Sequence, residues 1–148
     1  ALKVAAEENV FSEQTKSQIK KLQDLTTEEV NKFVCGIETE SNPLTKILVT
    51  GEDKNSAIII IEGIIERAAK LVAANLGAVI LKTGKAKSAD SPVLMTIEGT
   101  TFYKMKKFQK MCDAFLKDFL SGDNKRYYEI TEVENSSLLG AAIAAIVN

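Results

Sequence analysis

The sequence predicts an α/β fold, in which helices pack on a small sheet. Three observations indicate this class. An apolar run at 93–97 is followed by helical spacing of apolar residues at 103–119, and an alternating run at 126–133 is followed by small residues at 138–147. The third observation is a long helical pattern at 57–82. Helices that precede and separate two strands are typical of part of a layered α/β domain.

The first strand-turn-helix unit carries the first candidate site. Pro92 opens a short apolar strand that we expect to be buried, Gly99 turns the chain at its carboxyl end, and one amphipathic helix is expected to reach Phe119. Ligands of open α/β sheets bind beyond the carboxyl ends of strands. Gly99 would let a ligand approach the backbone, and Thr100 and Thr101 offer hydroxyls. These residues could equally turn the chain and cap a helix without binding anything.

The second unit follows the strand at 126–133 and carries the second candidate site. Ser136 or Ser137 is expected to cap the helix at 138–147, and residues 140–142 (Gly-Ala-Ala) remove bulk from its first turn. Free N–H groups at such a helix start favour a ligand rich in hydrogen-bond acceptors. The two turns could therefore hold one ligand between them, although small residues also serve plain packing.

The remaining elements follow from local patterns. We expect a helix from the first residue to about residue 8, with no cap before it, and a helix at 28–36 with Thr26 or Thr27 as N-cap. A short helix at 44–49 follows a polar loop. The polar run 52–56 is expected to break the pattern and cap the long helix at 57–82, for which a strand at 58–61 is the alternative.

Composition excludes several kinds of function. The 148 residues suit one domain, and the net charge of −1 gives no basic footprint for nucleic acid or an anionic membrane. No histidine is present, which excludes histidine-based acid–base catalysis and histidine-ligated zinc. The longest apolar stretch, at 57–81, contains charged residues and is not expected to span a membrane. Lysines 104, 106, 107 and 110 are interpreted as a solvated helix face.

Cysteine usage points to a reducing compartment. Cys35 and Cys112 each have apolar neighbours in the sequence and are far apart along the chain. Two isolated cysteines of this kind fit a cytoplasmic protein better than a disulfide scaffold.

Three blocks together resemble the carboxyl-terminal part of hexokinases. Residues 64–71 (IIERAAKL) resemble the long helix with its Arg-Ala-Ala core, 96–103 (TIEGTTFY) resemble the adenosine motif, and 135–142 (NSSLLGAA) resemble the closing segment, in the family's order. The resemblance implies the actin-like ATPase superfamily and its ribonuclease-H-like fold, here incomplete. It assigns residues 1–148 to the carboxyl-terminal portion of the large, nucleotide-binding domain. The start of the chain in mid-helix and the small number of strands then suggest a fragment.

The resemblance also implies a site and a reaction. The parent would phosphorylate a hexose such as glucose with ATP and Mg²⁺, and this chain would supply the adenosine side of the nucleotide cleft. The nucleotide-binding residues it implies are Gly99, Thr100, Ser136, Ser137, Leu139 and Thr27. Glu98 departs from the family's usual aspartate, and 135–139 lack two of its glycines. Nothing here resembles the phosphate loop, the catalytic aspartate or the sugar-binding residues, so no catalytic or metal-ligating residue is expected in this chain.

Two other interpretations remain open. The chain could be a non-catalytic binding or dimerisation module of the same fold, in which case an exposed apolar face and self-association are expected. It could also be a plain helical domain without a ligand, in which Gly99 and Gly140 only turn and pack.

Overall fold

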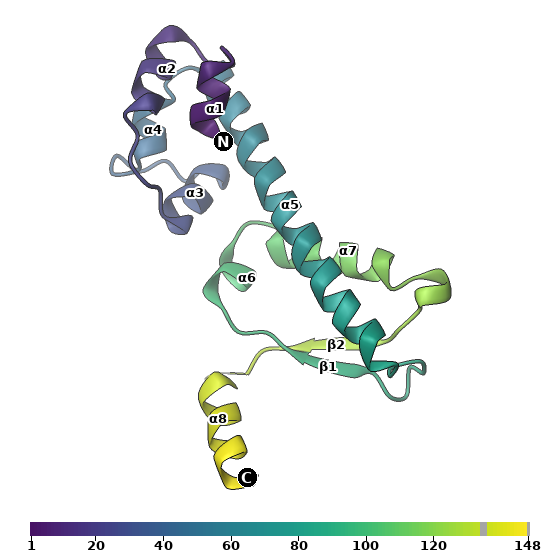
Figure 1. The fold of residues 1–148 in the computed structure, drawn as a ribbon. Helices are drawn as coiled ribbons and strands as arrows, with labels where there is room; N and C mark the ends of the chain where they lie inside the picture. Colours follow the sequence, from purple (N-terminus) through teal and green to yellow (C-terminus); the bar gives the residue numbers. More distant parts are fainter. Residues whose placement is uncertain (134–135, 148) are drawn as a thin grey trace. The chain divides into compact units, whose positions relative to one another are not determined.

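The computed structural model describes residues 1–133 and 136–147, and these fall into two compact units, Ala1–Ala68 and Ala69–Asn148. Figure 1 shows the elements along the chain. Those before the sheet are α1 (Leu2–Glu7), α2 (Glu13–Lys20), α3 (Thr27–Val34), α4 (Pro43–Ile47) and α5 (Gly51–Thr83). The others are β1 (Val93–Thr96), α6 (Thr100–Lys104), α7 (Phe108–Phe119), a 3-10 turn (Gly122–Asn124), β2 (Tyr128–Thr131) and α8 (Ser136–Val147).

The first unit contains α1 to α4 and the first part of α5. Its short helices begin at side-chain caps: Ser12 for α2, Thr26 for α3 and Asn42 for α4. Thr26 forms a full capping box with Glu29, which confirms one of the two predicted caps. Apolar side chains from all of these helices are buried in this unit: Ala6, Phe11, Ile19, Phe33, Val34, Leu44, Leu48, Ala57, Ile61 and Ile65.

The second unit is built around a two-stranded parallel sheet. β1 pairs with β2 in the register Val93↔Tyr128 to Thr96↔Thr131. Met95 of β1 is buried in a core cluster with side chains of α5 and α7, namely Ala73, Ile80, Leu116 and Leu120. Ala73 and Ile80 of α5 therefore pack in one core with β1 and with residues at the end of α7.

The predicted single helix at 103–119 is wrong in one respect, because it is divided into α6 and α7. Met105 is extended and Lys107 is left-handed, with φ 61°. Phe102 and Phe108 are both buried and meet edge to face, with ring centroids 6.2 Å apart. The two residues are six positions apart. In a continuous helix, with about 100° of rotation per residue, their rings would point about 120° apart around the helix axis. The break lets both rings enter the same core.

The predicted break at 52–56 is also wrong, since α5 begins at Gly51 and includes these residues. The acidic residues Glu52 and Asp53 lie in its first turn, where the helix dipole favours negative charge. Asp53 is buried and accepts hydrogen bonds from Ser12 and Thr15 of the first unit. The polar residues at 52–56 thus form the first turns of the helix, where Asp53 has buried hydrogen-bond partners. Because the helix continues through 58–61, the alternative strand there is excluded.

One burial prediction needs correction. The first strand was expected to be buried, but Leu94 is 64% exposed and only Met95 of β1 is fully buried, because the two faces of a strand alternate. Of the two cysteines, Cys112 is buried and Cys35 is exposed at the end of α3. An apolar neighbourhood in the sequence does not bury a residue whose helix face points outward.

Candidate functional site

The turn after β1 forms one wall of the candidate site. Gly99 has φ 140°, which disfavours other residues, and precedes α6. The Tyr103 hydroxyl donates to the carbonyl oxygen of Ile97 at 2.9 Å, so α6 folds back onto the end of the strand. Phe102 is buried beside it, with the Phe102 and Tyr103 rings 5.1 Å apart. The hydrogen bond from Tyr103 and the packing of the buried Phe102 ring together hold the turn in place.

Glu98 joins this turn to the first turn of α8. Its carboxylate oxygen accepts hydrogen bonds from the backbone N–H of Ser137 at 3.2 Å and from the Ser137 hydroxyl at 2.9 Å. A carboxylate suits this position, because the first N–H groups of a helix have no partner within the helix. The contact connects residues 39 positions apart in the chain. It brings together the two candidate turns that the sequence predicts.

A cavity of about 470 Å³ lies at this turn. It is lined by Glu98, Gly99, Thr100, Tyr103, Lys104, Glu132 and Val133. Burial raises the pKa of the Tyr103 phenol, and the charge of Glu132 raises it further, so the phenol stays protonated as a donor. The two carboxylates accept hydrogen bonds and Thr100 can donate or accept. The lining therefore favours a ligand part that carries hydroxyl or amino groups.

Only some of the predicted nucleotide-binding residues lie at this cavity. Gly99 and Thr100 line the cavity, and Ser137 contacts Glu98 in its lining. Leu139 is 50% exposed and does not line it, and Ser136 is the first residue of α8. Both serines lie within the helix, and the preceding residue, where a cap would stand, is outside the described residues. Thr27 begins α3 in the first unit.

Sequence reasoning missed Tyr103, Lys104 and Glu132 as lining residues, and treated Glu98 only as a departure from a family pattern. One signal was available. Glu132 follows directly after β2, so it lies at the same carboxyl edge of the parallel sheet as Glu98 does after β1. Pairs of polar residues just past neighbouring parallel strands meet at one edge.

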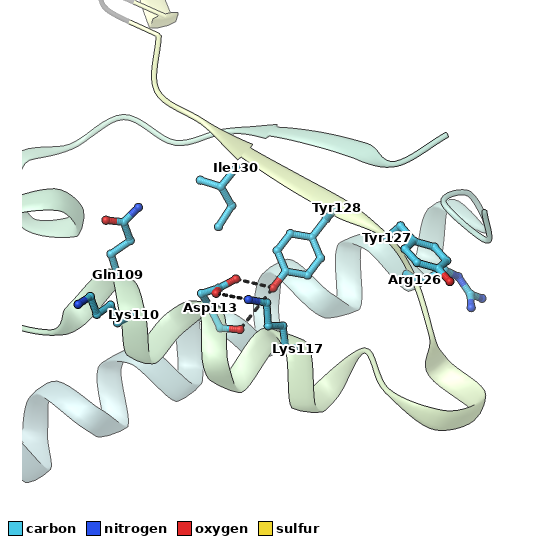
Figure 2. Close-up of a pocket in the computed structure, with 8 residues that line it drawn as sticks. All are labelled: Gln109, Lys110, Asp113, Lys117, Arg126, Tyr127, Tyr128 and Ile130. Carbon is cyan, nitrogen blue, oxygen red and sulfur yellow. Dashed lines mark hydrogen bonds and ion pairs between the residues drawn. The ribbon is translucent and has the colours of Figure 1, made fainter. Parts of the chain in front are cut away.

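A second cavity, of about 610 Å³, lies between α7 and β2 (Figure 2). Its lining residues are Gln109, Lys110, Asp113, Lys117, Arg126, Tyr127, Tyr128 and Ile130. Asp113 accepts from the Tyr128 hydroxyl and from Lys117, each at 2.7 Å. Burial raises the pKa of Tyr128, and the bond and charge of Asp113 raise it further. Sequence analysis interpreted Lys110 as part of a solvated face and assigned no role to this region.

The described residues include neither a membrane-spanning helix nor a cluster of metal ligands. None of their helices has the length and apolar character needed to cross a membrane. Within residues 1–133 and 136–147, no group of three or more acidic, cysteine or histidine side chains is arranged to hold a metal ion.

A glycine turn and a polar cavity at the carboxyl end of paired parallel strands are the features of a ligand-binding α/β domain. Comparison with family models specifies this class further. The model described as Hexokinase matches residues 1–147, and the chain belongs to the hexokinase family, with the match to its carboxyl-terminal domain. Comparison with curated protein sequences gave no match. The resemblance read from the three sequence blocks is thereby confirmed.

Family membership carries general consequences. Hexokinases phosphorylate hexoses with ATP and use Mg²⁺ with the nucleotide, and their carboxyl-terminal domain has an actin-like fold. The structure of this chain is helix-rich, with the small parallel sheet of β1 and β2.

Proposed function

We propose that this chain supplies the adenosine side of the nucleotide cleft in a hexokinase that phosphorylates a hexose, such as glucose, with ATP. The observation that carries the proposal is the contact between Glu98 and Ser137, because it joins the Gly99 turn to the start of α8 beside one cavity. Family membership supplies the reaction, and the cavity supplies the candidate place for the nucleoside.

The charge of the cavity favours the nucleoside over the phosphates. Glu98 and Glu132 are both in its lining, with Lys104 as a cation beside them. Ribose hydroxyls and an adenine amino group donate hydrogen bonds that carboxylates accept. A triphosphate at the same place would face two like charges, so it should extend away from these carboxylates. Gly99 would let the nucleoside approach the backbone.

The contribution of this chain to phosphoryl transfer is positional. Holding the nucleoside fixes the direction of the phosphate chain toward the acceptor hydroxyl, which lowers the entropic part of the barrier. Mg²⁺ bound to the phosphates supplies charge neutralisation in this chemistry. No metal-ligating group and no general base is assigned to the described residues. We expect the 148-residue chain to bind nucleotide weakly and not to turn over hexose.

The proposal predicts that adenosine binds at the Gly99 turn. In the full chain, adenosine and ATP should shift the amide signals of residues 98–104 and of Ser137, with a Kd no tighter than roughly millimolar. Gly99→Val should weaken this binding about tenfold or more, because its side chain would stand where the nucleoside approaches the backbone. The measurement is a titration followed by NMR.

Gly84→Val is the matched control. Gly84 also has a positive φ, of 68°, and an open Cβ position, but does not line the cavity. Gly84→Val also places a valine at a positive φ, but outside the cavity, so it should leave adenosine binding unchanged. The proposal is wrong if saturating adenosine shifts none of these signals, or if both valine variants bind adenosine as the natural chain does.

A specific observation also favours a second candidate, self-association through α8. Its apolar side chains are exposed, including Leu138 (71%), Ile143 (60%) and Ile146 (83%). An apolar helix with this exposure is typical of an interaction surface.

The second candidate predicts an equilibrium between monomer and dimer that depends on concentration. Sedimentation equilibrium of the full chain should detect it, and Leu138→Glu combined with Ile146→Glu should shift it to monomer. Ile59→Glu, at a position of α5 that is 71% exposed, tests whether any apolar surface has this effect. A natural chain that stays monomeric at all concentrations would contradict this candidate.

A further inference from the structure

One edge of the sheet in the second unit has open backbone hydrogen-bonding groups. Tyr127 uses its N–H and its carbonyl on one side, bonding to Ala86 and to Val93 of β1. Thr131 accepts from Ile97 on that same side. Adjacent strand residues direct these groups to opposite sides, so those of Tyr128 and Ile130 point away from β1. Within the described part of the chain, nothing pairs with them.

The cavity between α7 and β2 lies along this edge. Tyr128 and Ile130 line it from the strand, and Gln109, Lys110, Asp113 and Lys117 line it from α7 (Figure 2). A polypeptide strand placed beside β2 would therefore direct every second side chain toward α7. The edge and the cavity form one surface, which we call the β2 edge cleft.

The charges of the β2 edge cleft are mainly positive. The lining contains three cations, Lys110, Lys117 and Arg126, and one acidic side chain, Asp113, whose carboxylate is bonded to Lys117 and Tyr128. Among the described residues, neither Lys110 nor Arg126 has an acidic partner. The Nε atom of Arg126 is buried with no hydrogen-bond acceptor, and its Nη1 donates to the Lys125 carbonyl oxygen. The charges of Lys110 and Arg126 thus remain for an anionic partner.

We propose that the β2 edge cleft binds an extended acidic polypeptide segment, which adds to the sheet as a strand beside β2. Strand addition uses the open backbone groups of Tyr128 and Ile130. Carboxylates of the segment contact the cationic side chains of the cleft. Lys110 and Lys117 are about 10 Å apart along α7, at 1.5 Å per residue. Side chains on one face of a strand recur every ~7 Å, so carboxylates four residues apart are about 14 Å apart, and the long lysine side chains make up the difference of about 4 Å.

Asp113 refines the pattern of this segment. It lies between Lys110 and Lys117 on α7, so the side chain that faces it should be neutral and able to donate a hydrogen bond. The pattern that fits the cleft is Glu-x-Thr-x-Glu. Lysines beside an open edge also discourage pairing between neutral or basic strands. An acidic strand is the kind that they attract.

This proposal is independent of the adenosine site, because the two cavities share no lining residue. Failure of either proposal therefore leaves the other standing.

The probe is the capped peptide Ser-Glu-Val-Thr-Val-Glu-Ser, added to the full chain. It should slow hydrogen exchange of the Tyr128 and Ile130 amides at least tenfold at saturation, measured by NMR. Two N-methylated versions test strand pairing: one carries the methyl groups on both valines, the other on Glu, Thr and Glu. Since N–H groups of alternate strand residues point to opposite edges, only one version should lose binding. Equal binding of both would overturn the proposal.

Variants of the protein test the charges. Lys110→Glu should weaken peptide binding at least tenfold, whereas Lys46→Glu, at another exposed lysine, in α4 of the first unit, should leave it unchanged. A peptide with lysine in place of both glutamates should not bind. If tripolyphosphate shifts the signals of the cleft while the acidic peptide does not, the cleft is a site for small anions and the proposal is wrong.

Discussion

Asp53 is a buried acidic side chain of the first unit that accepts several hydrogen bonds. It is 3% exposed, and its carboxylate accepts from the Ser12 N–H at 2.9 Å, the Ser12 hydroxyl at 2.6 Å and the Thr15 hydroxyl at 2.7 Å. Burial alone would raise the pKa of Asp53, but these hydrogen bonds outweigh it and lower the pKa to about 2. The carboxylate thus ties α2 to the first turn of α5.

Asp53→Asn should destabilise the chain by about 1–3 kcal/mol, because an amide oxygen and an NH₂ group cannot accept all three bonds. Urea unfolding measures the loss. The control Glu52→Gln, an exposed acid in the same helix turn, should change stability by less than about 0.5 kcal/mol. Equal stabilities of the two variants would show that the Asp53 bonds contribute little.

The same group sets a pH dependence. The folded-state pKa of Asp53 lies below the unfolded value of about 3.9, so its stabilisation is complete above about pH 4 and is lost as the pH falls toward 2. In Asp53→Asn this part of the acid dependence should be absent.

At the residue scale, sequence reasoning identified the components of the site but not the contact between them. Gly99, Thr100 and Ser137 were expected near a ligand, because they begin helices after predicted strands. The bridge from Glu98 to Ser137 depends on how β1 and β2 pair, and no local pattern contains that information. Ser12, the N-cap of α2, was missed although its position before Glu13 is a local signal, whereas its bonds to Asp53, 41 residues away, have no such signal.

At the scale of elements, α5 offers two glycines in different surroundings. A Cβ on Gly63 would meet nothing within 4 Å. A Cβ on Gly77 would collide with the Phe119 ring, lying 2.7 Å from its Cε1 atom, and would approach the Leu116 side chain at 3.4 Å. Gly77 therefore lets α7 pack closely on α5.

Gly63→Ala should stabilise the chain by about 1 kcal/mol, since alanine is the better helix former. Gly77→Ala gains the same helix propensity but must displace Phe119, which should leave it about 1–3 kcal/mol less stable than Gly63→Ala. Thermal and urea unfolding measure both variants. If Gly77→Ala is as stabilising as Gly63→Ala, the partly exposed Phe119 ring moves aside at no cost.

Elements with strong local signals were predicted well. The Thr26 cap and the long apolar spacing of α5 depend on neighbours within a few residues, and both are present. The division between α6 and α7 was missed because nothing in the local pattern marks it. It depends on the burial of Phe102 and Phe108 in one core, which places Lys107 in a left-handed conformation.

At the scale of the whole molecule, the family was the most accessible property. Three motifs in a fixed order identify it, and a match over residues 1–147 confirms it. The division into two compact units was not predicted, because its boundary lies inside α5, where composition does not change. The β2 edge cleft was also missed, since it requires the direction of each backbone group along a paired strand.

The parallel pairing of β1 and β2 has a kinetic consequence during synthesis. Parallel neighbours need a crossover connection, and here the whole of residues 97–127, with α6 and α7, separates the two strands. β1 therefore leaves the ribosome well before its partner exists, and non-local pairing of this kind is slow to form. Until β2 arrives, the Met95 side chain can be covered by α5, which is made before β1, and later by α7, which is made before β2. The long helix α5 can thus cover the apolar face of β1 during the interval in which the strand is still unpaired and could pair with other chains.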